Sequence, residues 1–251
     1  MIDDVTDTAF LNGALTIRQP RQGYRAGIDP VLLAASVQAK SGQSVLELGC
    51  GVGTALLCLA HRVQRLQLTG VEVQSDYAEL ARHNAAMNGF EADIRTCDLR
   101  GLPDDLRNQT FNHVIANPPF FDPNCGSASP DAGRNMGRAG DTPLEEWCRI
   151  AAKRCAPKGV FSMIMAADRL PNVLTYMDPL FGGLEVKPVA SRDGRAAKLV
   201  LVRGIKGSLA GFTLHNPLIL HEGQAHRQDG ESYRPEISQI FRAGTAFSFL
   251  D

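Results

Sequence analysis

The feature that most restricts the fold of this chain is an alternation of short apolar runs with segments of helical periodicity. The apolar runs, which are typical of buried strands, lie at 45–48, 66–73, 92–97, 111–116 and 159–166. Segments with apolar residues at helical spacing lie between them, at 54–63, 75–87 and 144–155. Each helix returns the chain across the sheet, so successive strands pair in parallel. The alternation therefore predicts a doubly wound α/β fold.

The end of this pattern differs from its beginning. Residues 184–190 and 197–202 are two further apolar runs, separated only by a turn around Arg192-Asp193-Gly194. Strands joined without a helix between them pair antiparallel. We therefore predict a Rossmann-like sheet of seven strands, mostly parallel with an antiparallel last strand. Further helices are expected at 29–39 and from Asp168 onwards.

Three regions are expected along the chain. Residues 1–40 are predicted to form an N-terminal helical segment on the substrate side, and residues 41–207 the α/β domain. Residues 208–251 lack clear periodicity and are assigned to a C-terminal extension. Within the α/β domain, residues 122–142 are rich in Pro, Gly, Ser and Asp, which predicts a long loop.

Composition excludes several other classes of protein. No run of about 18 apolar residues is present, so a membrane span is not expected. The acidic N-terminus lacks the order of charges in a signal peptide, and the six cysteines contain no C-x-x-C pair, which favours free thiols in the cytoplasm. The spacing of His215, His221 and His226 matches no common zinc signature, so no metal is expected.

Basic residues cluster in two places, although the formal net charge is only −1. Residues 184–207 hold six basic and two acidic side chains, and residues 14–27 hold three arginines and no acid. Such patches attract phosphates, although ordinary solvated surface has the same composition. Both segments are candidate surfaces for phosphate groups, as are Arg134 and Arg138 in the predicted loop, which can equally be solvated charges.

A glycine-rich turn and two acids mark a candidate ligand site. The turn, "ELGCGVG" at 47–53, lies between the first strand and its helix, where glycines allow a close approach to a ligand. Its spacing is neither that of a dinucleotide fold nor that of a phosphate-binding P-loop. Glu72 and Asp98 follow the next two strands, where they can accept hydrogen bonds from a ribose and from an adenine amino group. Each of them can equally cap the helix that follows.

The segment "NPPF" at 117–120 ends the apolar run 111–116. Neither proline donates a backbone N–H, so the pair closes a strand and fixes a rigid turn. Alone, this sequence says no more than that. Together with "VLELGCGVG", "GVEVQ" and "CDL", it resembles the class I S-adenosylmethionine-dependent methyltransferases over about residues 20–205. The run "QGYRAGIDPVLLAA" from Gln22 makes the chain most similar to the bacterial valine-tRNA adenine N6-methyltransferase group.

The resemblance implies that S-adenosylmethionine is the cofactor and assigns the residues that hold it. These are Glu47, Gly49, Cys50, Gly51, Glu72, Val73, Asp98, Leu99 and Asn117, with Tyr24 and Asp29 closing over the methionine part. It also implies a catalytic role for Asn117, Pro118, Pro119 and Phe120. The Asn117 side-chain oxygen and the Pro118 carbonyl would accept the two N–H hydrogens of an exocyclic amine, so that its lone pair faces the methyl group. Phe120 would stack on the base.

The substrate implied by the resemblance is the N6 amine of adenine in RNA, with tRNA as the first choice. Separately from the resemblance, the protein is expected to be a monomer. Guanine N2 in rRNA and the side-chain amide of a protein glutamine stay open, because enzymes for both have similar NPP sites. A module of another class, which binds the cofactor and RNA without catalysis, is also open.

Overall fold

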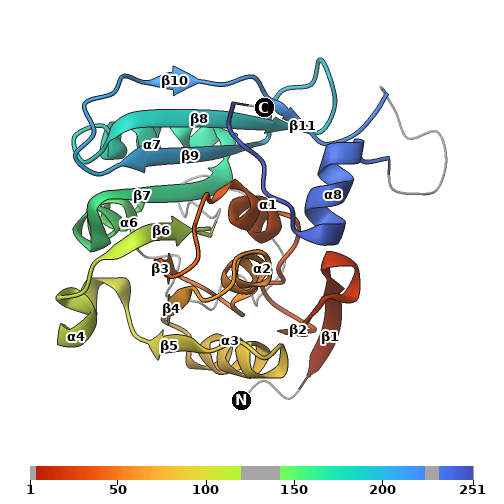
Figure 1. The fold of residues 1–251 in the computed structure, drawn as a ribbon, viewed down its shortest axis with the longest axis vertical. Coiled ribbons are helices and arrows are strands. Elements are labelled where there is room, and N and C mark those ends of the chain that lie inside the picture. The colour runs from red at the N-terminus through yellow and green to blue at the C-terminus, as the bar shows by residue number, and fades with distance from the viewer. Residues whose placement is uncertain (1–3, 120–141, 224–231, 251) are drawn as a thin grey trace.

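A computed structural model describes residues 4–119, 142–223 and 232–250. Its main sheet contains the seven expected strands in the order β8-β9-β7-β6-β3-β4-β5 (Figure 1). Only β9 runs antiparallel to its two neighbours. The fold prediction is therefore confirmed. The strand bounds are β3 (Ser44–Leu48), β4 (Gln67–Glu72), β5 (Ala92–Thr96), β6 (Phe111–Ala116), β7 (Cys155–Ala166), β8 (Gly182–Ala190) and β9 (Leu199–Ile205).

Helices cover both faces of this sheet (Figure 1). One face packs against α1 (Asp29–Ser36), α2 (Thr54–Arg62) and α3 (Ser75–Met87). The other packs against α4 (Asp104–Arg107), α6 (Leu144–Arg154), α7 (Leu170–Met177) and the short 3-10 helix η2 (Leu99–Gly101), while η4 (Ala167–Arg169) leads into α7. Successive strand residues point to opposite faces, so Val45 enters the first core and Leu46 the second. All parallel strands end at one edge, which is where the glycine loop and Asn117 lie.

The N-terminal segment contains a hairpin that the sequence analysis did not predict. Strands β1 (Val5–Phe10) and β2 (Leu15–Pro20) pair antiparallel around the turn η1 (Leu11–Gly13). The side chains of Asn84 on α3 and of Asn88, the residue that caps the end of α3, accept hydrogen bonds from the β2 backbone at 2.8 and 2.9 Å. The sequence carried a signal for this hairpin, because apolar and polar residues alternate over 15–18, after Asn12-Gly13, a pair that favours a tight turn.

The C-terminal segment packs against the rest of the molecule. The two-residue strands β10 (Thr213–Leu214) and β11 (Leu218–Ile219) extend the sheet beside β8. Helix α8 (Pro235–Ala243) and the following residues lie over α1 (Figure 1), where the Phe247 N–H donates to the Ala35 carbonyl. The buried Lys187 on β8 donates to the Phe249 carbonyl at 3.0 Å. These contacts join residues far apart in sequence, which explains why local periodicity did not reveal them.

The described residues were also searched for a membrane-spanning helix and for a metal site. Across the described residues, no helix is long and apolar enough to cross a membrane. The same residues contain no cluster of three or more metal-ligating side chains. Of the three histidines considered, His215 bonds the Glu185 carboxylate and His221 stacks on Tyr233, while His226 lies outside the described residues.

Candidate cofactor and acceptor site

The glycine loop adopts a backbone that side chains disfavour. Gly49, Gly51 and Gly53 have φ values of 64°, 54° and 84°, all in the left-handed region. At Gly49 space is also lacking, because a Cβ there would lie 2.5 Å from the Trp147 ring. The loop therefore turns tightly beneath the indole, and its backbone faces the open edge of the sheet.

This packing makes Gly49→Ala an informative substitution. We expect it to destabilise the fold by about 1–3 kcal/mol, since the new methyl group combines backbone strain with overpacking against Trp147. Thermal unfolding of the two proteins measures the change. Gly13→Ala is the matched control, because Gly13 also has a positive φ, of 87°, but nothing lies within 4 Å of its added Cβ. If Gly49→Ala lowers the stability no more than Gly13→Ala does, the Trp147 indole moves aside without a cost in stability, and the expectation is wrong.

Glu72 ties this loop to the next helix. Its side chain is buried at the end of β4, where it accepts hydrogen bonds from the Gly51 and Gln74 N–H groups, both at 2.9 Å. Burial raises the pKa of Glu72, and the backbone N–H groups around it oppose that rise. Each carboxylate oxygen has more than one lone pair, so these contacts leave room for ribose hydroxyls. The capping role and the predicted ligand role are thus compatible.

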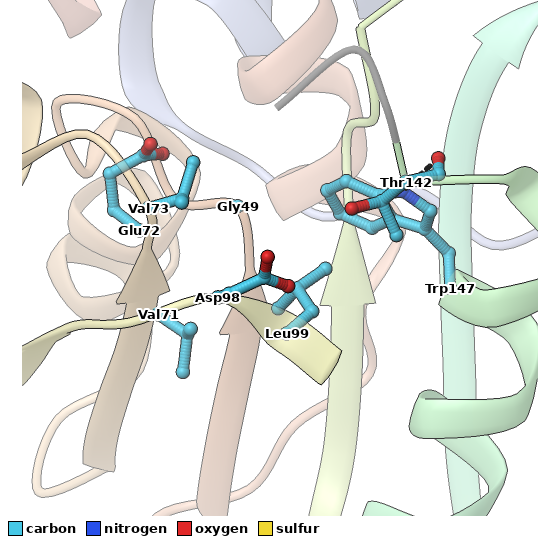
Figure 2. Close-up of a pocket in the computed structure, with 8 residues that line it drawn as sticks. All are labelled: Gly49, Val71, Glu72, Val73, Asp98, Leu99, Thr142 and Trp147. Carbon is cyan, nitrogen blue, oxygen red and sulfur yellow. Dashed lines mark hydrogen bonds between the residues drawn. The ribbon is translucent and has the colours of Figure 1, made fainter. Parts of the chain in front are cut away.

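A hollow opens beside Glu72 at the ends of neighbouring strands. Figure 2 shows the carboxyl groups of Glu72 and Asp98 on one side and the indole of Trp147 across from them. The residues that line it are Gly49, Val71, Glu72, Val73, Asp98, Leu99, Thr142 and Trp147. Carboxylates with an aromatic wall suit a nucleoside, which offers hydroxyl and amino donors as well as a flat ring.

Asp98 already has partners inside the protein. Its carboxylate accepts from the Arg100 backbone N–H at 2.8 Å and forms an ion pair with the Arg100 guanidinium at 2.7 Å. The guanidinium lowers the pKa of Asp98, which stays ionised as an acceptor. Asp98 therefore caps the short helix η2, as the alternative interpretation had it, and also lines the hollow. Its contact with an adenine amino group stays a prediction.

A second hollow lies on the other side of Gly49. Its lining residues are Tyr24, Ala26, Pro30, Glu47, Gly49, Cys50, Gly51, Val52, Thr54, Ala55 and Asn117. Asp29 is not among them, and its carboxyl instead contributes to raising the pKa of Tyr24, where burial has the larger effect. The two hollows share Gly49, so one elongated ligand can lie across the loop with an end in each.

Tyr24 connects the N-terminal segment to the acceptor residue. Its hydroxyl accepts a hydrogen bond from the Asn117 side-chain nitrogen at 3.3 Å, and its backbone N–H donates to the Tyr77 hydroxyl at 3.0 Å. With the nitrogen of Asn117 held by Tyr24, its oxygen is left to accept from a substrate. Pro118 is buried and Pro119 exposed, which fits a rigid turn, while Phe120 lies outside the described residues.

The described residues fit S-adenosylmethionine, which is cationic at the methionine end. Glu47 is buried in the second hollow, accepts one hydrogen bond from the Leu56 N–H at 3.2 Å, and has its pKa raised well above the usual value by burial. A nearby cation would favour its ionised form. The Thr54 hydroxyl is buried there without a hydrogen-bond partner, so a ligand amine or carboxylate would satisfy it.

Several residues of the two hollows escaped the sequence analysis. Trp147 on α6 is buried and also forms a wall of the first hollow. Thr142 and Thr54 also line the hollows and were not predicted as site residues. Only Thr54 carried a usable signal, as the first residue after the glycine loop, whereas the others reach the site through packing between distant elements.

Comparison with known proteins agrees with this geometry. Residues 26–147 match the methyltransferase small domain family. A protein of Porphyromonas gingivalis named tRNA1(Val) (adenine(37)-N6)-methyltransferase is 34% identical over 172 residues, which cover 64% of this chain and 66% of the relative. A protein of Tolumonas auensis with the same name is 26% identical and covers 74% of this chain and 78% of the relative.

Solved structures show the same architecture. A predicted O-methyltransferase from Agrobacterium tumefaciens superimposes with a TM-score of 0.70 at 27% identity, covering 88% of this chain and 98% of the other. A 16S rRNA N2 G1207 methyltransferase from T. thermophilus, in complex with AdoMet and guanosine, superimposes with a TM-score of 0.58 at 20% identity. The match covers 80% of this chain and 50% of the other.

The sequence matches are partial, since the alignments span just under two thirds of the length of the first curated relatives, at 66% and 64%. The match to the methyltransferase small domain, residues 26–147, includes the glycine loop, Glu72, Asp98 and Asn117. Residues 26–147 are thus similar to the methyltransferase small domain family, and the chain has the fold of the class I S-adenosylmethionine-dependent methyltransferases.

Proposed function

We propose that this protein is an S-adenosylmethionine-dependent N-methyltransferase that modifies the N6 amine of adenine in RNA, with tRNA as the substrate class. The observation that carries this proposal is the position of Asn117 at the rim of the second hollow, with its nitrogen held by Tyr24. The curated relatives that are similar to this chain in sequence are named for this reaction.

The chemistry follows from what the chain offers at that point. The bound cofactor supplies an electrophilic methyl group. Asn117 and the carbonyl of Pro118 accept the two amine hydrogens, which turns the nitrogen lone pair towards the second hollow. The rigid Pro-Pro turn limits rearrangement of these acceptors during the reaction. An amine with two N–H groups uses both acceptors, whereas a hydroxyl can use only one, which favours nitrogen over oxygen as the acceptor atom.

The wider assignments are part of the same proposal. Residues 41–207 bind the cofactor, residues 1–40 lie on the substrate side, and residues 208–251 extend the sheet. The enzyme acts as a monomer, without a metal, on RNA in the cytoplasm. A target adenine must leave its stack to reach Asn117, at a cost of a few kcal/mol unless it already lies in a loop.

The experiment that tests the function is a transfer of labelled methyl groups. The purified protein is incubated with methyl-labelled cofactor and bacterial tRNA that lacks the modification, and the digested nucleosides are identified by mass spectrometry. Label in N6-methyladenosine is the expected result. Label only in rRNA guanine or in protein glutamine would replace the substrate, and no label in any of these, with cofactor binding intact, would favour a binding module.

Cofactor binding can be tested separately through stability. S-adenosylhomocysteine at 100 times its dissociation constant should stabilise the fold by about 2.7 kcal/mol, because a ligand that binds only the folded state shifts the unfolding equilibrium. Thermal unfolding with and without the ligand measures this, and adenosine triphosphate serves as the control ligand. An unchanged melting temperature at saturating ligand would remove the cofactor from the proposal.

A further inference from the structure

The structure corrects the predicted basic surfaces. Most cations of the segment 184–207 are used inside the protein: Lys187 and Arg192 are buried, Arg203 pairs with Glu185, and Lys206 donates to two backbone carbonyls. The arginines of the segment 14–27 are engaged as well, Arg18 with Asp7, Arg21 with Asp4, and Arg25 with Thr6 and Thr8. Neither segment as a whole presents free cations to RNA.

A few basic side chains remain available. In the described parts of the chain, five of them form no hydrogen bond or ion pair and are exposed: Lys40, Lys153, Lys158, Arg195 and Lys198. The first three lie at the amino edge of the sheet, before β3, at the end of α6 and at the start of β7. Arg195 and Lys198 instead lie together in the turn between β8 and β9.

This hairpin tip, residues 191–198, lies at the same edge of the sheet as Asn117. Ala116 at the end of β6 pairs with Met163 of β7, and Leu199, directly after the tip, pairs with Ala166. Counted from Ala116, the tip therefore begins three residues farther along the strand direction and two strands away across the sheet. Each of these offsets is about 10 Å. Arg192 anchors it by donating to the Glu222 and Gly223 carbonyls, and an ion pair joins Asp193 to Arg234. The tip is therefore held in place while its two cations face solvent.

We infer that Arg195 and Lys198 form a phosphate-binding contact for the RNA strand whose base enters the acceptor site. The inference rests on the proposed function and adds the surface that holds the substrate. The two offsets place the start of the tip about 14 Å from Ala116, the residue before Asn117. Cations at that separation can reach phosphates a few nucleotides from a base held at Asn117, and such contacts position a nucleic acid without reading its sequence.

The test measures RNA binding directly, without turnover. Fluorescence anisotropy with end-labelled, unmodified tRNA, in the presence of S-adenosylhomocysteine, gives the Kd at several salt concentrations. For Arg195→Ala/Lys198→Ala we expect Kd to rise about 10-fold at low salt, and the slope of log Kd against log salt to fall by about 1 for each lost contact. The affinity for S-adenosylhomocysteine should stay unchanged.

The matched control is Lys153→Ala/Lys158→Ala, which removes two equally free cations from the opposite edge and should leave RNA binding unchanged. Arg195→Lys/Lys198→Arg should bind like the wild type, since it keeps both charges. A tip variant with wild-type affinity and salt slope, or a control variant that loses as much, overturns the inference. If the wild type binds tRNA through the tip but methylates no adenine, the proposed function fails while this contact stands.

Discussion

Replacing Asn117 by alanine should lower turnover by about 10²-fold or more, which is the usual cost of losing one preorganised polar contact in the transition state. The substitution removes the side-chain oxygen that accepts an amine hydrogen, yet it leaves the glycine loop and Glu72 in place. Binding of S-adenosylhomocysteine should therefore be retained. Single-turnover methylation of tRNA measures the first effect, and calorimetric titration the second.

A substitution of Tyr24 can distinguish the proposed role of the Asn117 oxygen from a simple loss of packing at Asn117. Tyr24→Phe removes the hydroxyl that holds the Asn117 nitrogen, so turnover should fall in the wild-type background. In an Asn117→Asp background the side chain has two oxygens, and both are acceptors. Either oxygen can face the substrate, so Tyr24 is not needed to select one orientation of the side chain. Tyr24→Phe should then cost little more. An equal cost in both backgrounds, or normal turnover in Asn117→Ala, would refute the proposed role.

Replacing Glu72 by alanine should weaken S-adenosylhomocysteine binding by about 10²-fold or more. Two ribose hydroxyls would each lose a hydrogen bond to a charged acceptor, worth about 1.5–3 kcal/mol apiece. The Gly51 and Gln74 N–H groups would also lose their shared acceptor, which loosens the loop between the two hollows. Isothermal titration calorimetry gives the affinity, and circular dichroism establishes that the variant is folded.

Asp98→Ala is the natural companion to this variant. Asp98 is already paired with Arg100, so its removal should reduce the affinity by less than that of Glu72. The affinity of Glu72→Gln for S-adenosylhomocysteine should lie between those of the wild type and of Glu72→Ala, because the amide keeps one acceptor oxygen. If Glu72→Ala binds the ligand as tightly as the wild type, the ribose assignment is wrong, and its carboxylate serves only to order the loop.

The sheet, and the residues that lie at the carboxyl ends of its strands, could be predicted because both depend on local sequence. Strand and helix periodicity determined the seven strands, and parallel pairing then placed the glycine loop, Glu72, Asp98 and Asn117 at one edge. The hairpin at 5–20 was equally local and was overlooked. Its Asn12-Gly13 turn and alternating residues are a recognised hairpin pattern.

Other features depend on contacts that no local pattern reveals. Charge counting treated every cation of the segment 184–207 as solvated, but Lys187 and Arg192 bond carbonyls of the C-terminal segment. Likewise, the contact of Trp147 with Gly49 and that of Tyr24 with Asn117 join elements about 98 and 93 positions apart. Such pairings follow from the folded topology, so the sequence alone could name these residues without assigning their partners.

The division of the site at Gly49 has a consequence for how small molecules compete there. Since the backbone of one glycine separates the two hollows, a nucleoside fragment and an amino-acid fragment would occupy different halves and bind at the same time. Each would displace the complete ligand, but neither would displace the other. Joining the two fragments then gains affinity mainly through effective concentration, because the second half is captured without a further loss of translational freedom.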